Sequence, residues 1–210
     1  MQTGLEEIVF TVIVLILSVI VHEIAHGYAA NALGDPTAKL AGRLTLNPLP
    51  HIDPVGSILI PGLMVLTNAG MLFGWAKPVP YNPYNLKNQR WGEAIVGIAG
   101  VATNLLLAVI FALVSRASLA GGEEVFSGLA ALVCYVNLFL GLFNLIPFPP
   151  LDGFTVLRGL LPYRMSLPLR SLEQNLGGIV GLLGFLLIFS YVLAKPFHSF
   201  VIYIFGFLIG

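Results

Sequence analysis

The sequence is poor in charged residues. Only 10% of its 210 residues are Asp, Glu, Lys or Arg, whereas soluble domains carry about 25%. Ten basic and ten acidic residues give a formal net charge of zero, and no basic patch interleaved with aromatic residues occurs. The composition therefore excludes nucleic acid as a partner.

Cysteine and an N-terminal positive charge are also scarce. Cys134 is the only cysteine and lies in an apolar run, which excludes an intramolecular disulfide framework and a thiolate metal site. The first residues include Glu6 and Glu7 but no Lys or Arg, so they lack the basic region of a cleaved signal peptide. We therefore expect Cys134 to pack in the interior and the first apolar segment to be a mature helix.

Apolar residues dominate what is present. They make up 57% of the chain, and the mean hydropathy is +0.91, which predicts an all-α polytopic membrane protein in contact with a lipid bilayer. We predict a single membrane-embedded domain over 1–210, with a core at 5–160 and a C-terminal helical hairpin at 177–210. Five to six membrane segments are expected, at residues 5–33, 53–75, 94–114, 125–146, 177–194 and 196–210.

The motif His22-Glu23-x-x-His26 lies near the end of the first apolar segment, after fourteen uncharged residues (8–21). Residues four apart share one face of a helix, so the two imidazoles can bind one metal ion with Glu23 beside them as a general base. Ionisable groups at such depth are costly and usually functional. The alternative is that the two histidines are only hydrogen-bonded to neighbouring residues. In that case the buried Glu23 carboxylate still requires a partner.

Catalytic zinc requires a third protein ligand and an open position for water. Asp152 follows the prolines 147, 149 and 150, which prevent a regular helix and favour extended backbone. The other acidic residues lie at loop edges or termini, and a carboxylate helps to neutralise a metal in a low-dielectric site. Alone, Asp152 also fits an Asp-Gly turn. Together with the histidine motif it predicts one Zn2+ per chain, held by His22, His26 and Asp152.

The basic residues predict the topology. Eight of the ten fall in three stretches: Lys39 and Arg43; Lys77, Lys87 and Arg90; and Arg158, Arg164 and Arg170. Basic residues of short loops lie on the cytoplasmic side, and these stretches share that side only if segment 53–75 is re-entrant. Re-entry also places Asp152 on the same side as the histidines, whereas a full crossing separates them by a bilayer. We therefore predict a cell-membrane protein with its active site toward the cytoplasm.

Segment 38–48 predicts a short β-hairpin near the active site. Leucines and polar residues alternate there at strand period, with Leu40, Leu44 and Leu46 on one side and Lys39, Arg43 and Thr45 on the other. An exposed strand edge of this kind can pair with an extended peptide. The alternative is a surface connector.

Two motifs together are similar to a known family. HEIAHG (22–27) in a membrane helix, followed by FNLIPFPPLDG (143–153), resembles the site-two protease family of intramembrane zinc metalloproteases. The resemblance covers nearly the whole chain and includes GRLTLNPLPHIDPVG (42–56) and GWAKPVPYNP (74–83), as in compact members without PDZ or CBS domains. It implies that His22, His26 and Asp152 bind zinc, that Glu23 is the catalytic base, and that a transmembrane protein is the substrate.

Two asparagines are candidates for substrate binding. Asn144 lies just before the proline run and could hydrogen-bond an extended peptide or the developing oxyanion, and Asn104 could do the same. The alternative for both is packing between helices. Family members carry G-P-x-x-N where this chain has Gly100-Val101-Ala102-Thr103-Asn104, so Val101 leaves the helix shape there open. We assign no ligand role to His51 or His198.

Two other functions compete with proteolysis. One is a proteolytically inactive, metal-binding membrane chaperone or scaffold, and the other is an ion transporter that relays ions through the histidines and the acid. The presence of Glu23 argues against an inert site, which needs no base. The lack of paired repeats argues against a transporter. The substrate and the oligomeric state do not follow from the sequence.

Overall fold

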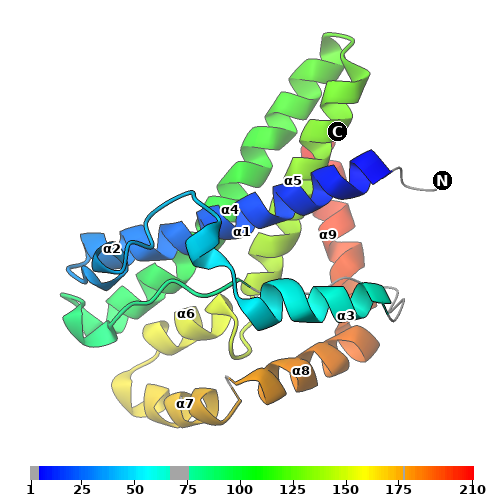
Figure 1. Ribbon diagram of the computed structural model, residues 1–210. Helices are drawn as coiled ribbons and strands as arrows, with labels where there is room; N and C mark the ends of the chain where they lie inside the picture. The colour runs from blue at the N-terminus through cyan, green and yellow to red at the C-terminus, as the bar shows by residue number, and fades with distance from the viewer. Residues whose placement is uncertain (1–4, 67–75, 177) are drawn as a thin grey trace.

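Helices are the only regular secondary structure in the residues that the structure describes. The computed structural model describes residues 5–66, 76–176 and 178–210 (Figure 1). Its α-helices are α1 (Leu5–Ala32), α2 (Thr37–Leu40), α3 (Ile60–Leu66), α4 (Gln89–Ala120), α5 (Glu124–Asn144), α6 (Asp152–Leu160), α7 (Tyr163–Leu176), α8 (Ile179–Ile188) and α9 (Ala194–Ile209). The all-α fold class is confirmed.

Four helical stretches in the described residues are long and apolar enough to cross a bilayer. They are Glu6–Ala32, Trp91–Ala120, Glu124–Asn144 and Gly181–Ile209. Large apolar side chains on these stretches remain exposed, among them Leu106 and Leu113, as expected for surfaces that face lipid. The structure therefore fits a multi-pass membrane protein, with four candidate crossings among the described residues; the sequence predicts five to six membrane segments, one of them re-entrant.

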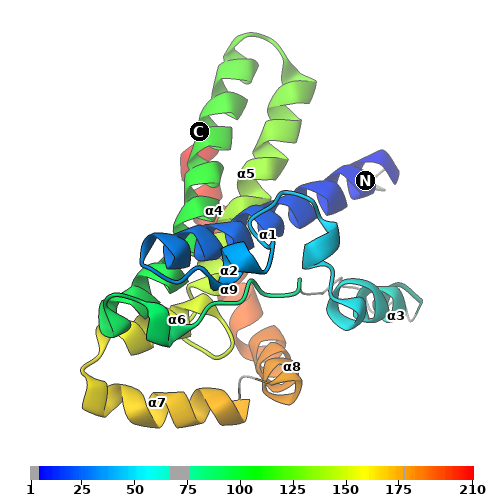
Figure 2. The same cartoon turned by 60° about the vertical axis from the view of Figure 1, so that its left-hand side comes forward.

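The last two predicted segments form one bent helical stretch and not a hairpin. The chain is helical without interruption from Ile179 to Ile209, and its direction changes at the π-helical turn Phe189–Leu193 between α8 and α9 (Figures 1 and 2). Pro196 follows this turn and has no N–H to donate to the carbonyl of Val192 within it, which is a common cause of helix bending. Lys195, which separates the two predicted segments, accordingly lies inside the helical stretch and not in a loop between them.

The core forms where α4, α5 and α9 meet. Helices α4 and α5 run antiparallel, and α1 crosses them (Figures 1 and 2). One buried cluster joins the three helices through Ala108, Ala112, Cys134, Leu138 and Val201. Small side chains let membrane helices approach closely, and Cys134 is fully buried in this cluster as expected.

The β-hairpin predicted for residues 38–48 is wrong. This segment contains α2 followed by turns and bends, and no strand occurs in the described parts of the chain. Leu40 and Leu46 are 81% and 64% exposed, while Arg43, predicted to lie on the side opposite the leucines, is buried and donates Nη2 to the Lys77 carbonyl at 2.6 Å. The alternation of leucines therefore does not mark a pleated strand.

Segment 53–75 begins as predicted. The carboxylate of Asp53 caps the helix by accepting the N–H groups of Val55 and Gly56 at 3.0 and 2.7 Å. A six-residue π-helix, Pro54–Leu59, and the seven-residue α3 follow, together shorter than the roughly 20 residues needed to span a bilayer. Residues 67–75 lie outside the described part, so re-entry stays a prediction.

The chain after α5 turns back toward α4. Residues 145–151 form turns and bends, as the prolines predict, but Asp152 is the first residue of α6 rather than part of an extended strand. Glycines permit close packing of α6 on α4: a Cβ on Gly159 would lie 2.6 Å from the Ala94 amide nitrogen, and one on Gly97 would lie 3.3 Å from the Asp152 carbonyl oxygen. This packing brings Asp152 to α1.

Candidate metal centre

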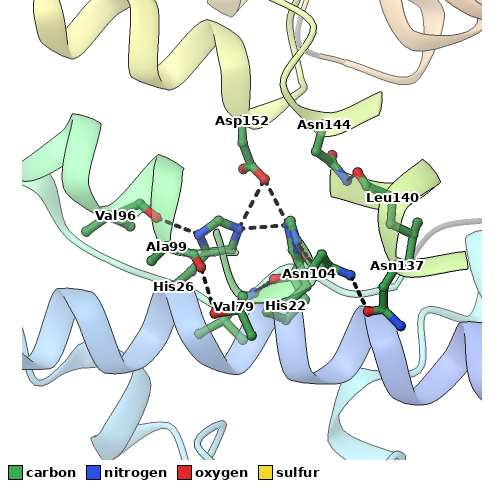
Figure 3. Close-up of polar contacts among 12 residues, drawn as sticks. His22, His26, Val79, Val96, Ala99, Asn104, Asn137, Leu140, Asn144 and Asp152 are labelled. Carbon is green, nitrogen blue, oxygen red and sulfur yellow. Dashed lines mark hydrogen bonds and ion pairs between the residues drawn. The ribbon is translucent and has the colours of Figure 1, made fainter. Parts of the chain in front are cut away.

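Three side chains from two distant parts of the sequence, His22 and His26 in α1 and Asp152 in α6, meet at one point (Figure 3). His22 and His26 project from the same face of α1, and their Nε2 atoms are 3.0 Å apart. Asp152, at the start of α6, places Oδ2 2.8 Å from Nε2 of His22 and 3.3 Å from Nε2 of His26. The structure thus brings together the three ligands that the sequence predicts.

The hydrogen bonds on the far side of each ring determine which nitrogen carries the proton. Nδ1 of His22 lies 2.7 Å from Oδ1 of Asn104, and Nδ1 of His26 lies 2.7 Å from the Val96 carbonyl oxygen. Both oxygens can only accept, so both Nδ1 atoms donate and a neutral ring presents a lone pair at Nε2. Two nitrogen lone pairs and one carboxylate oxygen therefore face each other.

This arrangement fits a zinc ion. Oδ2 of Asp152 is buried and accepts no hydrogen bond from the described residues, and three mutually facing acceptors repel one another unless a proton or a metal ion is shared among them. Two imidazole nitrogens and a carboxylate are a common catalytic zinc set, in which neighbouring ligand atoms lie about 3.3 Å apart. The separations in this triangle, 2.8, 3.0 and 3.3 Å, lie at or slightly below that spacing.

Glycine at position 100 makes room for the two rings. A Cβ at Gly100 would lie 2.6 Å from Nε2 of His26 and 2.7 Å from Nε2 of His22. Gly100 and Asn104 are one helical turn apart on α4, so the same face of α4 receives the rings and holds one of them. Helix α4 is continuous here and Val101 is fully buried, so the chain needs no proline at 101 to form this face.

Asn104 is the hydrogen-bond partner of His22. It is fully buried; its Oδ1 accepts from His22, and its Nδ2 donates to Oδ1 of Asn137 at 3.0 Å. Nδ2 of Asn137 in turn donates to Ser18 Oγ at 3.0 Å. A chain of polar side chains across α1, α4 and α5 therefore sets the orientation of His22. The substrate contact of Asn104 stays a prediction.

Replacing Asn104 by leucine is expected to weaken zinc binding by roughly 10- to 100-fold, because His22 loses the acceptor that holds its Nδ1 proton. The zinc dissociation constant can be measured by competition with a chromophoric chelator. Thr103→Val is the matched control, since the Thr103 hydroxyl donates to the Ala99 carbonyl of its own helix at 2.8 Å. Equal zinc affinity in both variants would contradict this role for Asn104.

The carboxylate of Glu23 lies beside the metal centre. Glu23 is half-buried, and its ligand atom and those of His22 and His26 all lie within 4.8 Å of one another. The Val79 backbone N–H donates to Oε2 of Glu23 at 2.7 Å. The base predicted from the sequence is therefore adjacent to the predicted ligands and held by a loop that precedes α4.

Asn144 and the remaining histidines make local contacts. Asn144 donates Nδ2 to the Leu140 carbonyl of its own helix at 3.0 Å (Figure 3), so a substrate role for it stays a prediction. His51 is buried and donates Nε2–H to the Thr45 carbonyl at 3.0 Å. His198 pairs through Nδ1 with the Tyr135 hydroxyl at 3.4 Å. Neither histidine joins the metal centre.

A buried ion-pair network that the sequence did not predict fixes α6 against α4 and α7. Glu93 of α4, 1% exposed, pairs with Arg158 of α6 at 2.8 Å and with Arg170 of α7 at 3.0 Å. Arg158 also pairs with Glu173 of α7. Because Asp152 begins α6, this network supports the position of the third ligand, and breaking one partner would leave a costly unpaired charge.

Comparison with known proteins places these features in a family. Residues 120–189 match the model of peptidase family M50. The chain is 38% identical over 201 residues to YwhC of Bacillus subtilis, described as a zinc metalloprotease, covering 92% of this chain and 84% of that protein. It is 31% identical to the zinc metalloprotease Rip2 of Mycolicibacterium smegmatis, over 68% of this chain and 53% of Rip2.

A more distant relative is the zinc metalloprotease MJ0392 of Methanocaldococcus jannaschii, 24% identical over 81% of this chain and 40% of that protein. No solved structure matches.

Proposed function

This chain belongs to peptidase family M50, the site-two protease family, and is a zinc metalloprotease; from that premise we propose that it hydrolyses peptide bonds within transmembrane segments of membrane proteins. The observation that carries this proposal is the position of the metal centre. His22 and His26 lie in α1, within a candidate membrane span, and the peptide that is cut must therefore reach them at membrane depth.

Each residue of the centre has a separate task in the proposed reaction. His22, His26 and Asp152 hold the zinc ion, which when bound supplies Lewis-acid chemistry that activates a water and polarises a carbonyl. Glu23 accepts a proton from the attacking water and returns it to the leaving amine. The Nδ1 contacts to Asn104 and Val96 keep both imidazoles in the orientation that ligation requires.

The substrate must be unwound before it can be cut. A transmembrane helix has its carbonyls in internal hydrogen bonds, so the segment that is cleaved must open and be held in an extended form. Asn144 lies at the end of α5, close to the turn that leads to Asp152. Its amide can donate to an extended peptide if it releases the Leu140 carbonyl, which is the substrate role that we propose for it.

The distribution of basic residues supports an orientation in which the metal centre lies toward the cytoplasmic side of the membrane. Lys39 lies in α2, Lys77 in the loop that hydrogen-bonds to Glu23, and Arg164 in α7, and by the positive-inside rule these basic stretches face the cytoplasm. We therefore assign the protein to the cell membrane, with the metal centre toward the cytoplasmic side.

Reconstitution with a single-span substrate tests the proposal. Zinc-loaded protein in liposomes is expected to cut within the apolar segment of the substrate, as located by mass spectrometry of the products. Removing the metal with a chelator is expected to stop cleavage, and added Zn2+ to restore it. Cleavage confined to soluble flanks, or undiminished cleavage after zinc has been removed, would contradict intramembrane zinc proteolysis. Failure to cut a panel of such substrates would favour a non-proteolytic metal protein.

A further inference from the structure

A short segment before α4 crosses the face of α1 that carries Glu23. We name residues 77–81 (Lys77-Pro78-Val79-Pro80-Tyr81) the Val79 segment; it contains no helix or turn and runs as an extended trace toward α4 (Figure 2). Its central amide, the Val79 N–H, donates to Oε2 of Glu23 at 2.7 Å. The partner of the catalytic base is therefore a backbone group.

Two prolines make this amide the single donor of its stretch. Pro78 and Pro80 have no N–H, so Val79 carries the only backbone donor between positions 78 and 80. Proline also restricts itself and the preceding residue to extended backbone, which limits the directions that the Val79 amide can take. The sequence thus produces one donor in a stiff segment, and the structure directs it at Glu23.

Hydrogen bonds at both ends fix the Val79 segment in place. At its start, the Lys77 N–H donates to the His51 carbonyl at 2.8 Å, and the Lys77 carbonyl accepts from Arg43 at 2.6 Å. Just beyond its end, the Asn82 N–H donates to Oδ2 of Asp35 at 2.6 Å. These contacts hold the segment independently of its bond to Glu23.

Asp35 is a strong anchor for the end of the segment. Burial alone would raise the pKa of this carboxyl, but hydrogen bonds from Thr37, Asn85 and Asn82 lower the pKa below its ordinary value. Asp35 is therefore ionised at neutral pH, and its bond to the Asn82 amide is charge-assisted.

The Val79 side chain adds a packing contact on the same face of α1. Val79 is buried, and its Cγ1 lies 3.0 Å from the position of a Cβ on Gly27. Gly27 is four residues after Glu23, one turn along α1, and it gives the Val79 segment room to approach the helix. Backbone and side chain of Val79 thus meet one face of α1 at adjacent turns.

We propose that the Val79 backbone amide is a positioning group for the catalytic base, an inference that rests on the proposed function. By binding Oε2 it restricts rotation of the Glu23 carboxylate. No other hydrogen bond to this carboxylate occurs among the described residues, so Oε1 remains available for proton transfer at the neighbouring metal centre. The sequence signal for this role is the pattern Pro78-x-Pro80, and the identity of the residue between the prolines matters less than its N–H.

Removing only the N–H tests the inference. An ester linkage at position 79, introduced with the α-hydroxy analogue of valine, keeps the side chain and deletes the donor. We expect kcat on a transmembrane substrate to fall roughly 10- to 100-fold, as for the loss of one charge-assisted hydrogen bond, with KM and bound zinc unchanged. The simpler variant Val79→Pro also lacks the N–H, and we expect the same loss of kcat. Val79→Ala keeps the N–H, and its kcat is expected to lie between that of Val79→Pro and that of the wild type.

An ester at position 77 is the matched control. It deletes the Lys77 N–H, which binds the His51 carbonyl, and so loosens the Val79 segment without removing the donor to Glu23. We expect its kcat to exceed that of the position-79 ester. Equal kcat in the two ester variants, or loss of zinc or a raised KM at position 79, would overturn the positioning role. An inactive wild type would instead contradict the proposed function.

Discussion

Replacing Glu23 by glutamine is expected to lower kcat by roughly 100- to 10,000-fold, the range that a general base contributes. Glutamine has nearly the same shape but cannot accept a proton at the pH of the reaction, and its amide oxygen can still accept the Val79 N–H. The variant should therefore fold and keep one zinc per chain, because Glu23 is not among the three side chains that form the ligand triangle.

Zinc content and turnover must be measured on the same preparation of the Glu23→Gln variant. Asp152→Ala provides the contrast, because it removes a predicted ligand and should lose both metal and activity. Cleavage that persists in zinc-loaded Glu23→Gln would contradict the role of Glu23 as the base. Loss of zinc in Glu23→Gln would instead move Glu23 into the ligand set.

The parts of the centre that the sequence predicts are those whose chemistry depends on side-chain identity. Spacing on a helix paired His22 with His26. The need for a third zinc ligand, together with the proline run and the positions of the other acidic residues, led to Asp152. The contacts to Val96 and Val79 could not be found in this way, because a backbone carbonyl or amide is the same at every residue. Only the proline pattern around Val79 marks its amide as unusual.

The errors in the fold have a different cause. Alternation of leucines in 38–48 predicted strands, but Arg43 is buried by its bond to the Lys77 carbonyl, and a tertiary contact of this kind overrides a local pattern. The hairpin predicted for 177–210 requires a chain reversal near residue 195, between its two segments, yet the helix continues there and only bends at the preceding π-helical turn. Lys195 and Pro196 interrupt the apolar sequence, but an interruption of apolar sequence does not by itself produce a loop.

The buried ion pairs also could not be predicted from the local sequence. Glu93 and Arg158 lie 65 positions apart in the sequence, and neither is part of a motif, so nothing local indicates that they pair at 2.8 Å. Their pairing depends on α6 folding back onto α4 after the proline run. The topology predicted from the basic residues puts Asp152 on the same side of the membrane as the histidines, but it does not identify the residues that pair.

Among residues that are not predicted zinc ligands, Gly100 is where we expect a substitution, Gly100→Ala, to reduce zinc affinity most. The added methyl carbon would lie 2.6 Å from Nε2 of His26 and 2.7 Å from Nε2 of His22, closer than any unstrained contact. The rings cannot move away freely, because Asn104 and the Val96 carbonyl hold their Nδ1 atoms at 2.7 Å. Relief of the clash must therefore break those bonds or displace both ligand nitrogens, and we expect zinc affinity to fall by roughly 100-fold or more.

Gly128→Ala is the control for helix propensity. A Cβ at Gly128 of α5 meets no atom within 4 Å, so this variant should keep its zinc and gain about 0.5–1 kcal/mol of helix stability. Zinc stoichiometry by atomic absorption and thermal unfolding of the same samples separate the two effects. If Gly100→Ala folds and binds zinc as tightly as Gly128→Ala, the two histidine Nε2 atoms do not lie against α4 at position 100. The geometry of the centre would then have to be revised.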